Sequence, residues 1–301
     1  RRVLFRSNSR RISNKIEKKY KRPIDNLYSY RFYEDLFTNY AYSLSEKKFD
    51  RSDFFMIVSD DKEIVKIFRN ATKYSFSYEF EQTINDALYS MAVYGQAYIF
   101  VKPEYVKKTE KDGKFNDVFN ALHIVEVKGI AKKNTFYYRS FSKEILSFDI
   151  NEGVLITLDL KDLGFKRNYF KNLVKRLGKY DTTSASLGLI NNEPSYDFGV
   201  HVKKNQEKLL REVRNIGWSF GTDGLSDSYI LYKEIKKRIF KMRLLQYVLE
   251  KINKVLADEF FQHKGVRIEA LTNNIDYLKV WERYNKGELT VSDLNKIIWT
   301  R

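Results

Sequence analysis

The sequence predicts an α+β protein that is mainly helical, with a small, mostly antiparallel β-sheet domain and one very long helix. Helix-period apolar patterns cover most of the chain, and short aromatic or β-branched runs alternate with polar turns in residues 96–160. One apolar stripe continues through residues 226–260. The chain has 301 residues, 43% of them hydrophobic, so it can bury a sizeable core. No run of about 18 apolar residues occurs, which predicts that no segment spans a membrane.

The first seven residues, 1–7, have the sequence encoded by one reading frame of a common sequencing adaptor, and we interpret them as an artefact. Leaving out Arg1, Arg2 and Arg6 lowers the formal net charge from +16 to +13. This charge favours an anionic partner, with nucleic acid first. The competing interpretation is that lysines spread along the chain form an ordinary solvated surface.

Residues 8–95 are predicted to form a basic N-terminal arm followed by helices. The arm covers residues 10–22 and stops at Pro23, which cannot continue a helix. Aromatic residues at three- and four-residue steps predict an amphipathic helix over residues 25–45 that packs on the core, and base stacking by these rings is the alternative. The Asp-Asp-Lys-Glu sequence at 60–63 places an acceptor at the N-cap of a further helix.

The sequence from Ala87 to Val101 joins a helix to a strand. Helical spacing continues up to Tyr94, and the five residues that start at Ala97 have the pattern of a buried strand. Gly95 stands where the chain needs a left-handed C-cap before it enters that strand. Local physics alone therefore accounts for the glycine.

Residues 96–160 form the predicted β-rich region, and residues 161–225 are predicted to contain helices and loops. Asp112-Gly113 is the pair expected in a tight turn. Helical periodicity returns near Lys166 and again over residues 203–216. The strands expected after the one at Ala97 are residues 123–127, 135–139, 145–150 and 154–160.

Residues 226–301 are predicted to hold the long helix and the C-terminal helices. The long helix measures roughly 50 Å if it is unbroken, and lysines and arginines fall between the positions of its apolar stripe. A brief strand at 268–271 and a helix at 275–284 follow. Thr290 and Asp293 have the spacing of a capping box that starts a last short helix.

Catalytic patterns are weak throughout the sequence. The chain has no cysteine, which excludes disulfides, thiolate nucleophiles and thiolate-bound zinc. His123, His201 and His263 lie far apart, without the spacing by which one helix closes around a metal. Each histidine is expected to be a surface or structural residue.

Two enzymatic alternatives remain. Residues 217–221 read Gly-Trp-Ser-Phe-Gly and match the Gly-x-Ser-x-Gly pattern of a hydrolase, but a helical pattern precedes them where that site needs a strand. Asp60 and Asp61 offer a Mg²⁺ site, but they also serve as helix-start residues, and no second acidic cluster accompanies them. We therefore expect a binding or structural protein, without catalytic residues, cofactor or metal.

Several short motifs occur in a meaningful order. Residues 94–99 read Tyr-Gly-Gln-Ala-Tyr-Ile, residues 144–149 read Glu-Ile-Leu-Ser-Phe-Asp, and Leu-Gly-Phe at 163–165 precedes a helical pattern. Residues 281–290 form a helical pattern followed by Gly, Leu and Thr, with Asp293 just beyond. In this order the motifs resemble those of tailed-bacteriophage portal proteins, in which a similar Tyr-Gly-x-Ala-Tyr step joins a helix to the sheet of the wing region.

The resemblance implies a structural subunit of a homo-oligomeric ring, usually of twelve copies, at one vertex of the virion capsid, assembled in the host cytoplasm. Such a ring passes double-stranded DNA through its channel, docks the packaging terminase, and later binds capsid and head-tail connector proteins. It catalyses nothing. A DNA channel needs cations that meet phosphates without reading bases. The candidates for DNA-facing residues are Lys236, Lys237, Lys241, Arg10 and Arg11.

The alternative function is a basic nucleic-acid-binding or replication-associated protein that acts as a monomer or dimer. The charge of +13 that remains without the first seven residues, and the interleaved Lys and Tyr residues, support it. No helix-turn-helix, zinc-finger or RNA-binding signature is recognisable. The mass in solution distinguishes the two functions, because only the portal interpretation requires a ring.

Overall fold

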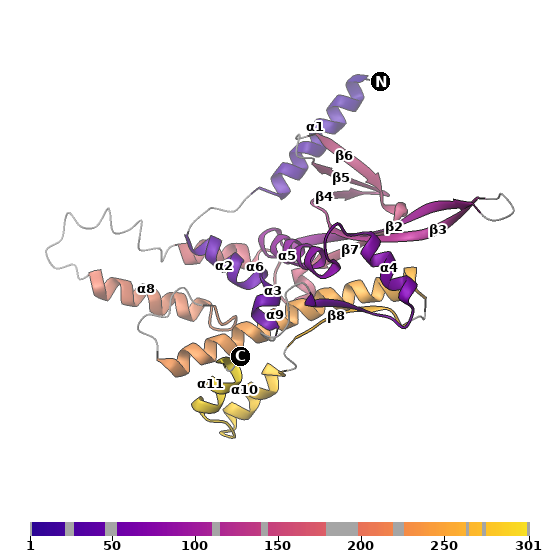
Figure 1. Ribbon diagram of the computed structural model, residues 1–301. Coiled ribbons are helices and arrows are strands. Elements are labelled where there is room, and N and C mark those ends of the chain that lie inside the picture. The colour runs from indigo at the N-terminus through magenta and orange to yellow at the C-terminus, as the bar shows by residue number, and fades with distance from the viewer. Residues whose placement is uncertain are drawn as a thin grey trace.

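The computed structural model describes residues 2–21, 27–45, 53–109, 115–139, 144–178, 198–218, 226–262, 265–272 and 275–299. Within these ranges the predicted fold class is confirmed, because helices predominate, every strand pair is antiparallel, and one helix is far longer than the rest. Figure 1 shows the helices gathered around small sheets. The predicted Asp112-Gly113 turn lies outside the described residues.

The basic N-terminal arm is a helix, α1 (Arg2–Lys19), that lies against a small sheet. That sheet has the order β4-β5-β6, formed by Gly129–Lys132, Thr135–Arg139 and Ile145–Asp149. An ion pair of 3.1 Å joins Glu17 to Arg139 across this contact. Helix α1 includes all but the first of residues 1–7, and the interpretation of those residues as an artefact stays a prediction.

The single helix predicted over residues 25–45 is wrong, because the chain forms two helices there. Helix α2 (Leu27–Phe37) and helix α3 (Tyr40–Leu44) are separated at Asn39, which has the left-handed φ of 56°. Asparagine tolerates this conformation better than most residues. The aromatic residues do pack on the core as predicted, since Phe32, Phe37 and Tyr40 are fully buried.

The predicted helix start at residues 60–63 is confirmed by helix α4 (Lys62–Asn70), whose N-cap Asp61 accepts a hydrogen bond from the backbone N–H of Glu63. Before it lies a strand that the sequence analysis missed, β1 (Phe55–Val58). This strand pairs with β8 (Arg267–Ala270), which lies far away in sequence. The pairing ties the N-terminal and C-terminal halves of the chain together.

The helix-to-strand step forms as predicted. Helix α5 (Phe76–Tyr94) ends at Gly95, whose φ is 80° and whose N–H donates to the carbonyl of Met91. Strand β2 (Gln96–Thr109) follows at once and lies in the centre of a sheet with β3 (Phe115–Glu126) on one side and β7 (Val154–Asp159) on the other. Ala97, Ile99 and Val101 face the buried core.

Two short helices continue the chain beyond this sheet. The 3₁₀ turn η3 (Leu160–Leu163) and helix α6 (Tyr169–Leu177) follow β7, and helix α8 (Phe198–Glu212) packs on α6. Helix α6 confirms the helical periodicity predicted near Lys166. The helix predicted over residues 203–216 is confirmed up to Glu212, beyond which residues 213–217 form a turn.

The predicted long helix is confirmed as α9 (Asp227–Val255), which has 29 residues and continues as one π-helical turn, Leu256–Phe260. It crosses the body of the protein below α5 and the central sheet (Figure 1). The Tyr247 hydroxyl accepts from the backbone N–H of Asp159 at 3.0 Å, at the end of β7. Asn253 exchanges two hydrogen bonds with the backbone of Ile268 in β8, at 2.8 and 2.9 Å. Helix α9 thus fixes two sheets.

Two buried cores lie along α9. The main core surrounds its C-terminal half and extends to α2, α5, α6 and the central sheet. A smaller core joins Leu231 and Ile235 of α9 to Leu294 and Ile298. The last two residues belong to α11 (Val291–Trp299), which follows α10 (Tyr277–Asn285). The predicted capping box is present, because Thr290 and Asp293 exchange side-chain to backbone hydrogen bonds.

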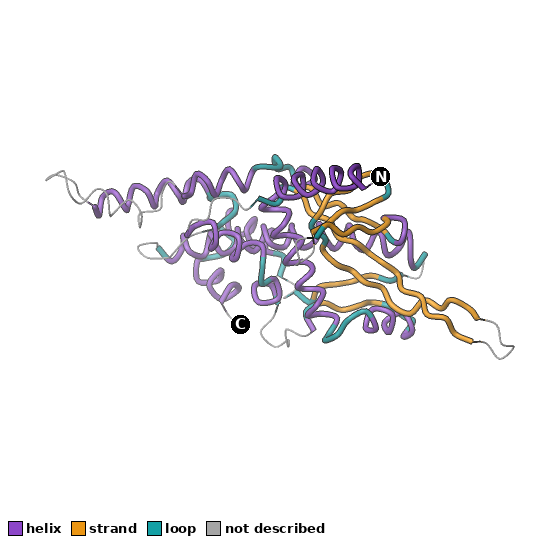
Figure 2. Tube along the Cα trace, turned by 90° about the horizontal axis from the view of Figure 1, so that it is seen from above, coloured by secondary structure: helices purple, strands orange, loops and turns teal. Residues whose placement is uncertain are grey.

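Strands β2 and β3 extend well beyond the body as a two-stranded ribbon (Figure 2). The C-terminal helices lie on a different side of the molecule. Tyr105 on the ribbon is 57% exposed, and Leu278 on α10 is 54% exposed. Apolar side chains are thus exposed on the ribbon and on the C-terminal helices, and also elsewhere on the described surface.

Replacing Gly95 by alanine is expected to lower the free energy of unfolding by about 2 kcal/mol or more, because a side chain there is strained at positive φ. The new Cβ would also collide with the backbone carbonyl oxygen of Arg167. Gly164→Ala is the matched control, since Gly164 has the same φ of 80° but no atom within 4 Å of the added Cβ. Urea unfolding should show a larger loss for Gly95→Ala, and equal losses would contradict the close contact with Arg167.

Candidate functional site

Lys241, one of the predicted DNA-facing residues, is buried, so that prediction is wrong for this side chain. Its relative exposure is 1%. The Nζ atom donates to the carbonyl oxygens of Asp35 at 3.1 Å and Thr38 at 2.8 Å, and to the Ser43 hydroxyl at 2.7 Å. It also lies 4.7 Å from the centre of the Tyr40 ring. The three acceptors surround the break between α2 and α3, so Lys241 holds that break against α9.

Burial changes the chemistry of the Lys241 amine. Desolvation, helped by the nearby positive charge of Lys237, lowers the pKa of Lys241 to about 7. The carboxylates of Glu234, Asp35 and Glu81 oppose this shift. A lysine with a pKa near neutrality is often a catalytic group. Here, among the described residues, the amine donates only to Asp35, Thr38 and Ser43, on α2, in the break and on α3, and this geometry supports a structural role.

Two further cations on α9 are also buried. Lys233 donates to the carbonyl of Trp218 at 3.1 Å, and desolvation lowers the pKa of Lys233 to about 8. Arg238 donates to Glu234 at 3.0 Å and to the Tyr277 hydroxyl at 2.6 Å. The long helix is therefore enclosed on several sides, and its charges between the stripe positions are not simply a solvated face.

Lys236 and Lys237, the other two predicted DNA-facing residues of α9, remain partly exposed. The Lys237 ammonium forms an ion pair of 2.6 Å with Glu234, which also binds Arg238. The Lys236 ammonium lies 4.7 Å from the centre of the Trp281 ring. Lys237 thus has a neutralising partner, whereas Lys236 lies on an aromatic surface.

Arg11 on α1 is exposed, and the side chain of Arg10 lies outside the described residues. The far end of the same helix is anchored to the protein. The Lys19 amine donates to the Tyr98 hydroxyl at 3.1 Å and to the Gly129 carbonyl at 3.3 Å. Desolvation, and then the charge of Arg167, lower the pKa of Lys19 to about 8. Of the predicted cations, Arg11 is the one placed on an open surface.

Glu126 is the carboxylate with the most unusual environment and was not singled out from the sequence. Its side chain accepts a hydrogen bond of 2.7 Å from Ser90. Desolvation raises the pKa of Glu126 to about 7, and nearby Lys128 only partly offsets this. Its position at the end of a predicted strand gave no sign of burial.

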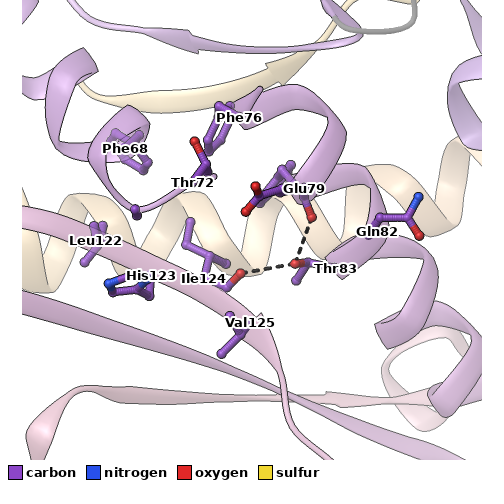
Figure 3. A pocket seen from close by; sticks show the side chains of 12 residues that line it. Phe68, Thr72, Phe76, Glu79, Gln82, Thr83, Leu122, His123, Ile124 and Val125 are labelled. Atoms are coloured by element: carbon purple, nitrogen blue, oxygen red, sulfur yellow. Dashed lines mark hydrogen bonds between the residues drawn. The ribbon is translucent and has the colours of Figure 1, made fainter. Parts of the chain in front are cut away.

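The cavity shown in Figure 3 lies between α4, α5 and strand β3 and has a volume of 270 Å³. Two of its polar side chains, Thr83 and Glu79, already have partners within the protein. The Thr83 hydroxyl bonds to the carbonyls of Glu79 and Ile124, and the Glu79 carboxylate accepts from the N–H groups of Lys73 and Tyr74 at 2.7 Å. Most of the remaining wall is apolar, so the cavity offers no convergent catalytic groups.

The histidine and serine patterns do not assemble into a catalytic site among the described residues. His123 is on the surface as predicted, 2.9 Å from Glu104. The side chains of His201 and His263, and the whole of Ser219, lie outside the described residues. Helix α8 and a turn precede Trp218, where a hydrolase would have a strand.

Neither a metal-binding cluster nor a membrane-spanning helix is found among the described residues. No three His, Cys, Asp or Glu side chains there gather closely enough to hold a metal ion. No helix in that part of the chain combines the length and apolarity needed to cross a membrane.

The structure adds one group of residues that the sequence analysis did not single out. Arg211 at the end of α8 and Arg214 in the turn that follows line an open groove together with Tyr229 and Tyr232 on α9. In the sequence, two arginines three residues apart are followed by two tyrosines three residues apart, and this pattern is the signal by which the group could have been found.

No protein-family model matches the sequence. No curated protein matches it either. We therefore infer the function from the geometry of the chain and from the resemblance of its short motifs.

The pKa of Lys241 leads to a pH prediction. Between about pH 7 and pH 10 the free energy of unfolding should rise more steeply for the wild-type protein than for Lys241→Met, by up to about 1.4 kcal/mol per pH unit, the value for one proton. The reason is that the amine loses its proton near pH 7 when folded but near its ordinary pKa of 10.5 when unfolded. The unfolded state therefore binds more protons in this interval, and alkali favours folding.

Urea unfolding at several pH values measures this difference. Lys236→Met is the control, because that residue is on the same helix but its side chain is only partly buried. Equal pH slopes for the wild-type protein and Lys241→Met would show that the amine keeps its proton when folded.

Proposed function

We propose that this chain is a structural subunit of a bacteriophage portal ring, through which double-stranded DNA is packaged and ejected. The observation that carries the proposal is the step at residues 94–99. Helix α5 ends at Gly95, and the strand that follows is the central strand of a small sheet. This is the arrangement that the resemblance implies for the wing region of a portal subunit.

The order of the other elements supports the same function. A basic helix precedes the step, and residues 144–149 form a strand, β6, followed by Gly164 and helix α6. Helix α9 then crosses the protein, and the chain continues through α10, Gly287 and the capped α11.

A ring needs two different surfaces on each subunit, because its contacts are head to tail. Among the described residues, exposed apolar side chains lie at several places, and two of these places are on different elements far apart in the sequence. On the ribbon, Tyr105 and Val118 are exposed, and the Tyr105 ring packs on Phe119. On the C-terminal helices, Leu278 and Trp299 are exposed. These two surfaces are the contacts we propose between neighbouring subunits.

Double-stranded DNA is the molecule that we propose passes through the ring. Arg11 is the residue best placed to contact its phosphates before assembly. Partners such as the terminase, capsid proteins and head-tail connector proteins come with the portal assignment. The protein's role in this proposal is mechanical and electrostatic, and the buried Lys241 contributes to the fold of the subunit.

The proposal predicts that the full chain forms rings of about twelve copies of its 35.9 kDa subunit at micromolar concentration. Mass photometry gives the number of subunits, and negative-stain images show whether the particle has a central hole. A chain that stays monomeric or dimeric under these conditions and binds DNA with a steep salt dependence would instead support a basic nucleic-acid-binding protein.

Tyr105→Lys is expected to shift the ring toward monomers, because it places a charge in one proposed contact. Tyr30→Lys is the matched control, since Tyr30 is a comparably exposed tyrosine on α2. The fraction of protein in rings, measured by mass photometry at several concentrations, compares the two variants. Equal ring fractions would remove the ribbon from the subunit contact.

A further inference from the structure

The groove between α8 and α9 combines free positive charge with aromatic rings. It has a volume of 480 Å³ and is open to solvent. Its lining residues are Glu207, Leu210, Arg211, Arg214, Tyr229 and Tyr232. The groove is separate from the Lys241 site and from the cavity beside Thr83.

The two arginines supply the charge. Arg211 and Arg214 are both exposed, Arg211 in the last turn of α8 and Arg214 in the turn that follows the helix, and both line the groove. Among the described residues, neither guanidinium forms an ion pair or a hydrogen bond with an acid. Nearby Glu212 is bound by Arg176 at 3.1 Å instead. Glu207 is the single acid in the wall, and it only partly offsets the two positive charges.

The tyrosines supply the aromatic surface. The rings of Tyr229 and Tyr232 are stacked, with centroids 5.8 Å apart and an angle of 11° between their planes. Neither ring belongs to the two buried cores formed by the described residues. Desolvation raises the pKa of the Tyr229 hydroxyl, and the charge of Arg214 opposes the shift, which places the guanidinium near the ring.

The stacked pair continues into a longer row of rings. Tyr232 contacts Trp281 edge to face at 5.0 Å, and Trp281 lies 5.8 Å from Tyr284. The Lys236 ammonium lies over Trp281 and within 5.9 Å of the Tyr232 ring centre. Cations therefore accompany the rings from α8 to α10.

We propose that this groove binds a single-stranded segment of nucleic acid, with phosphates on Arg211 and Arg214 and bases stacked beside Tyr229 and Tyr232. Aromatic stacking combined with a cationic groove is the usual way in which proteins hold single strands without reading sequence. An acidic protein segment would use the arginines but would leave the stacked rings without a matching partner. Binding here goes beyond the proposed portal ring and does not require ring assembly.

The test uses the full chain and a fluorescently labelled twelve-nucleotide oligothymidylate, with binding followed by anisotropy at several salt concentrations. Arg211→Ala/Arg214→Ala should weaken binding by about tenfold or more and reduce the salt slope by about 1.4, the amount for two phosphates on a single strand. Lys203→Ala/Lys204→Ala is the matched control, because it removes two exposed charges from the same helix outside the groove. The control should keep the affinity within about twofold of the wild type.

A second pair of variants tests the stacking. Tyr229→Leu should weaken binding several-fold, roughly as loss of a stacking ring does in other single-strand sites, whereas Tyr229→Phe keeps the ring and should keep the affinity. Glu207→Gln should strengthen binding, because it removes the negative charge from the wall.

Three results would overturn the proposal. The first is an equal loss of affinity in the Lys203/Lys204 control, which would mean that only total charge matters. The second is unchanged binding by Tyr229→Leu. The third is competition by a decaglutamate peptide or by a DNA duplex as strong as that by unlabelled single strand. Either result would mean that the groove recognises negative charge alone.

Ring formation is measured on the same samples by mass photometry, so the two proposals fail separately. Rings without oligothymidylate binding would leave the portal function in place and exclude the groove site. Oligothymidylate binding by a protein that never forms rings would support the groove site and exclude the portal function.

Discussion

The fold depends on one constraint. The cationic side chains of the long helix α9 need hydrogen-bond partners where the helix crosses the interior of the protein. Lys241 meets this constraint, because its buried amine donates to three oxygen atoms around the break between α2 and α3. Burying a charged or polar group without partners costs several kcal/mol. The break at Asn39 turns these oxygen atoms toward α9, so the helix interruption and the buried lysine stabilise each other.

The same rule governs the neighbouring cations. Lys233 lies against the carbonyl of Trp218, whose indole N–H in turn donates to Asp35 at 2.9 Å. Arg238 binds Glu234 and Tyr277 between the two cores. Of the candidate DNA-facing residues on α9, Lys241 therefore connects the helix to α2 and α3, whereas Lys237 pairs with Glu234 of its own helix.

Local signals in the sequence predicted much of the fold. The cap at Asp61, the left-handed Gly95, the capping box at Thr290 and the unbroken helix α9 each depend on a few neighbouring residues, and each is present. The missed features depend on distant partners. Strand β1 has only four residues, too few to show a period, and exists because β8 pairs with it. The burial of Lys241 could not be read from its spacing, because α2 and α3 supply the covering side.

Helix α9 also connects the two buried cores of the protein mechanically. Its first turns belong to the small core with α11, and its later turns belong to the main core with the central sheet. With 29 residues, α9 is about 43 Å long at 1.5 Å per residue. A displacement of the C-terminal helices would therefore be transmitted to the central sheet largely through α9. The hydrogen bonds of Lys241 to α2, α3 and the break between them hold the middle of this helix in place.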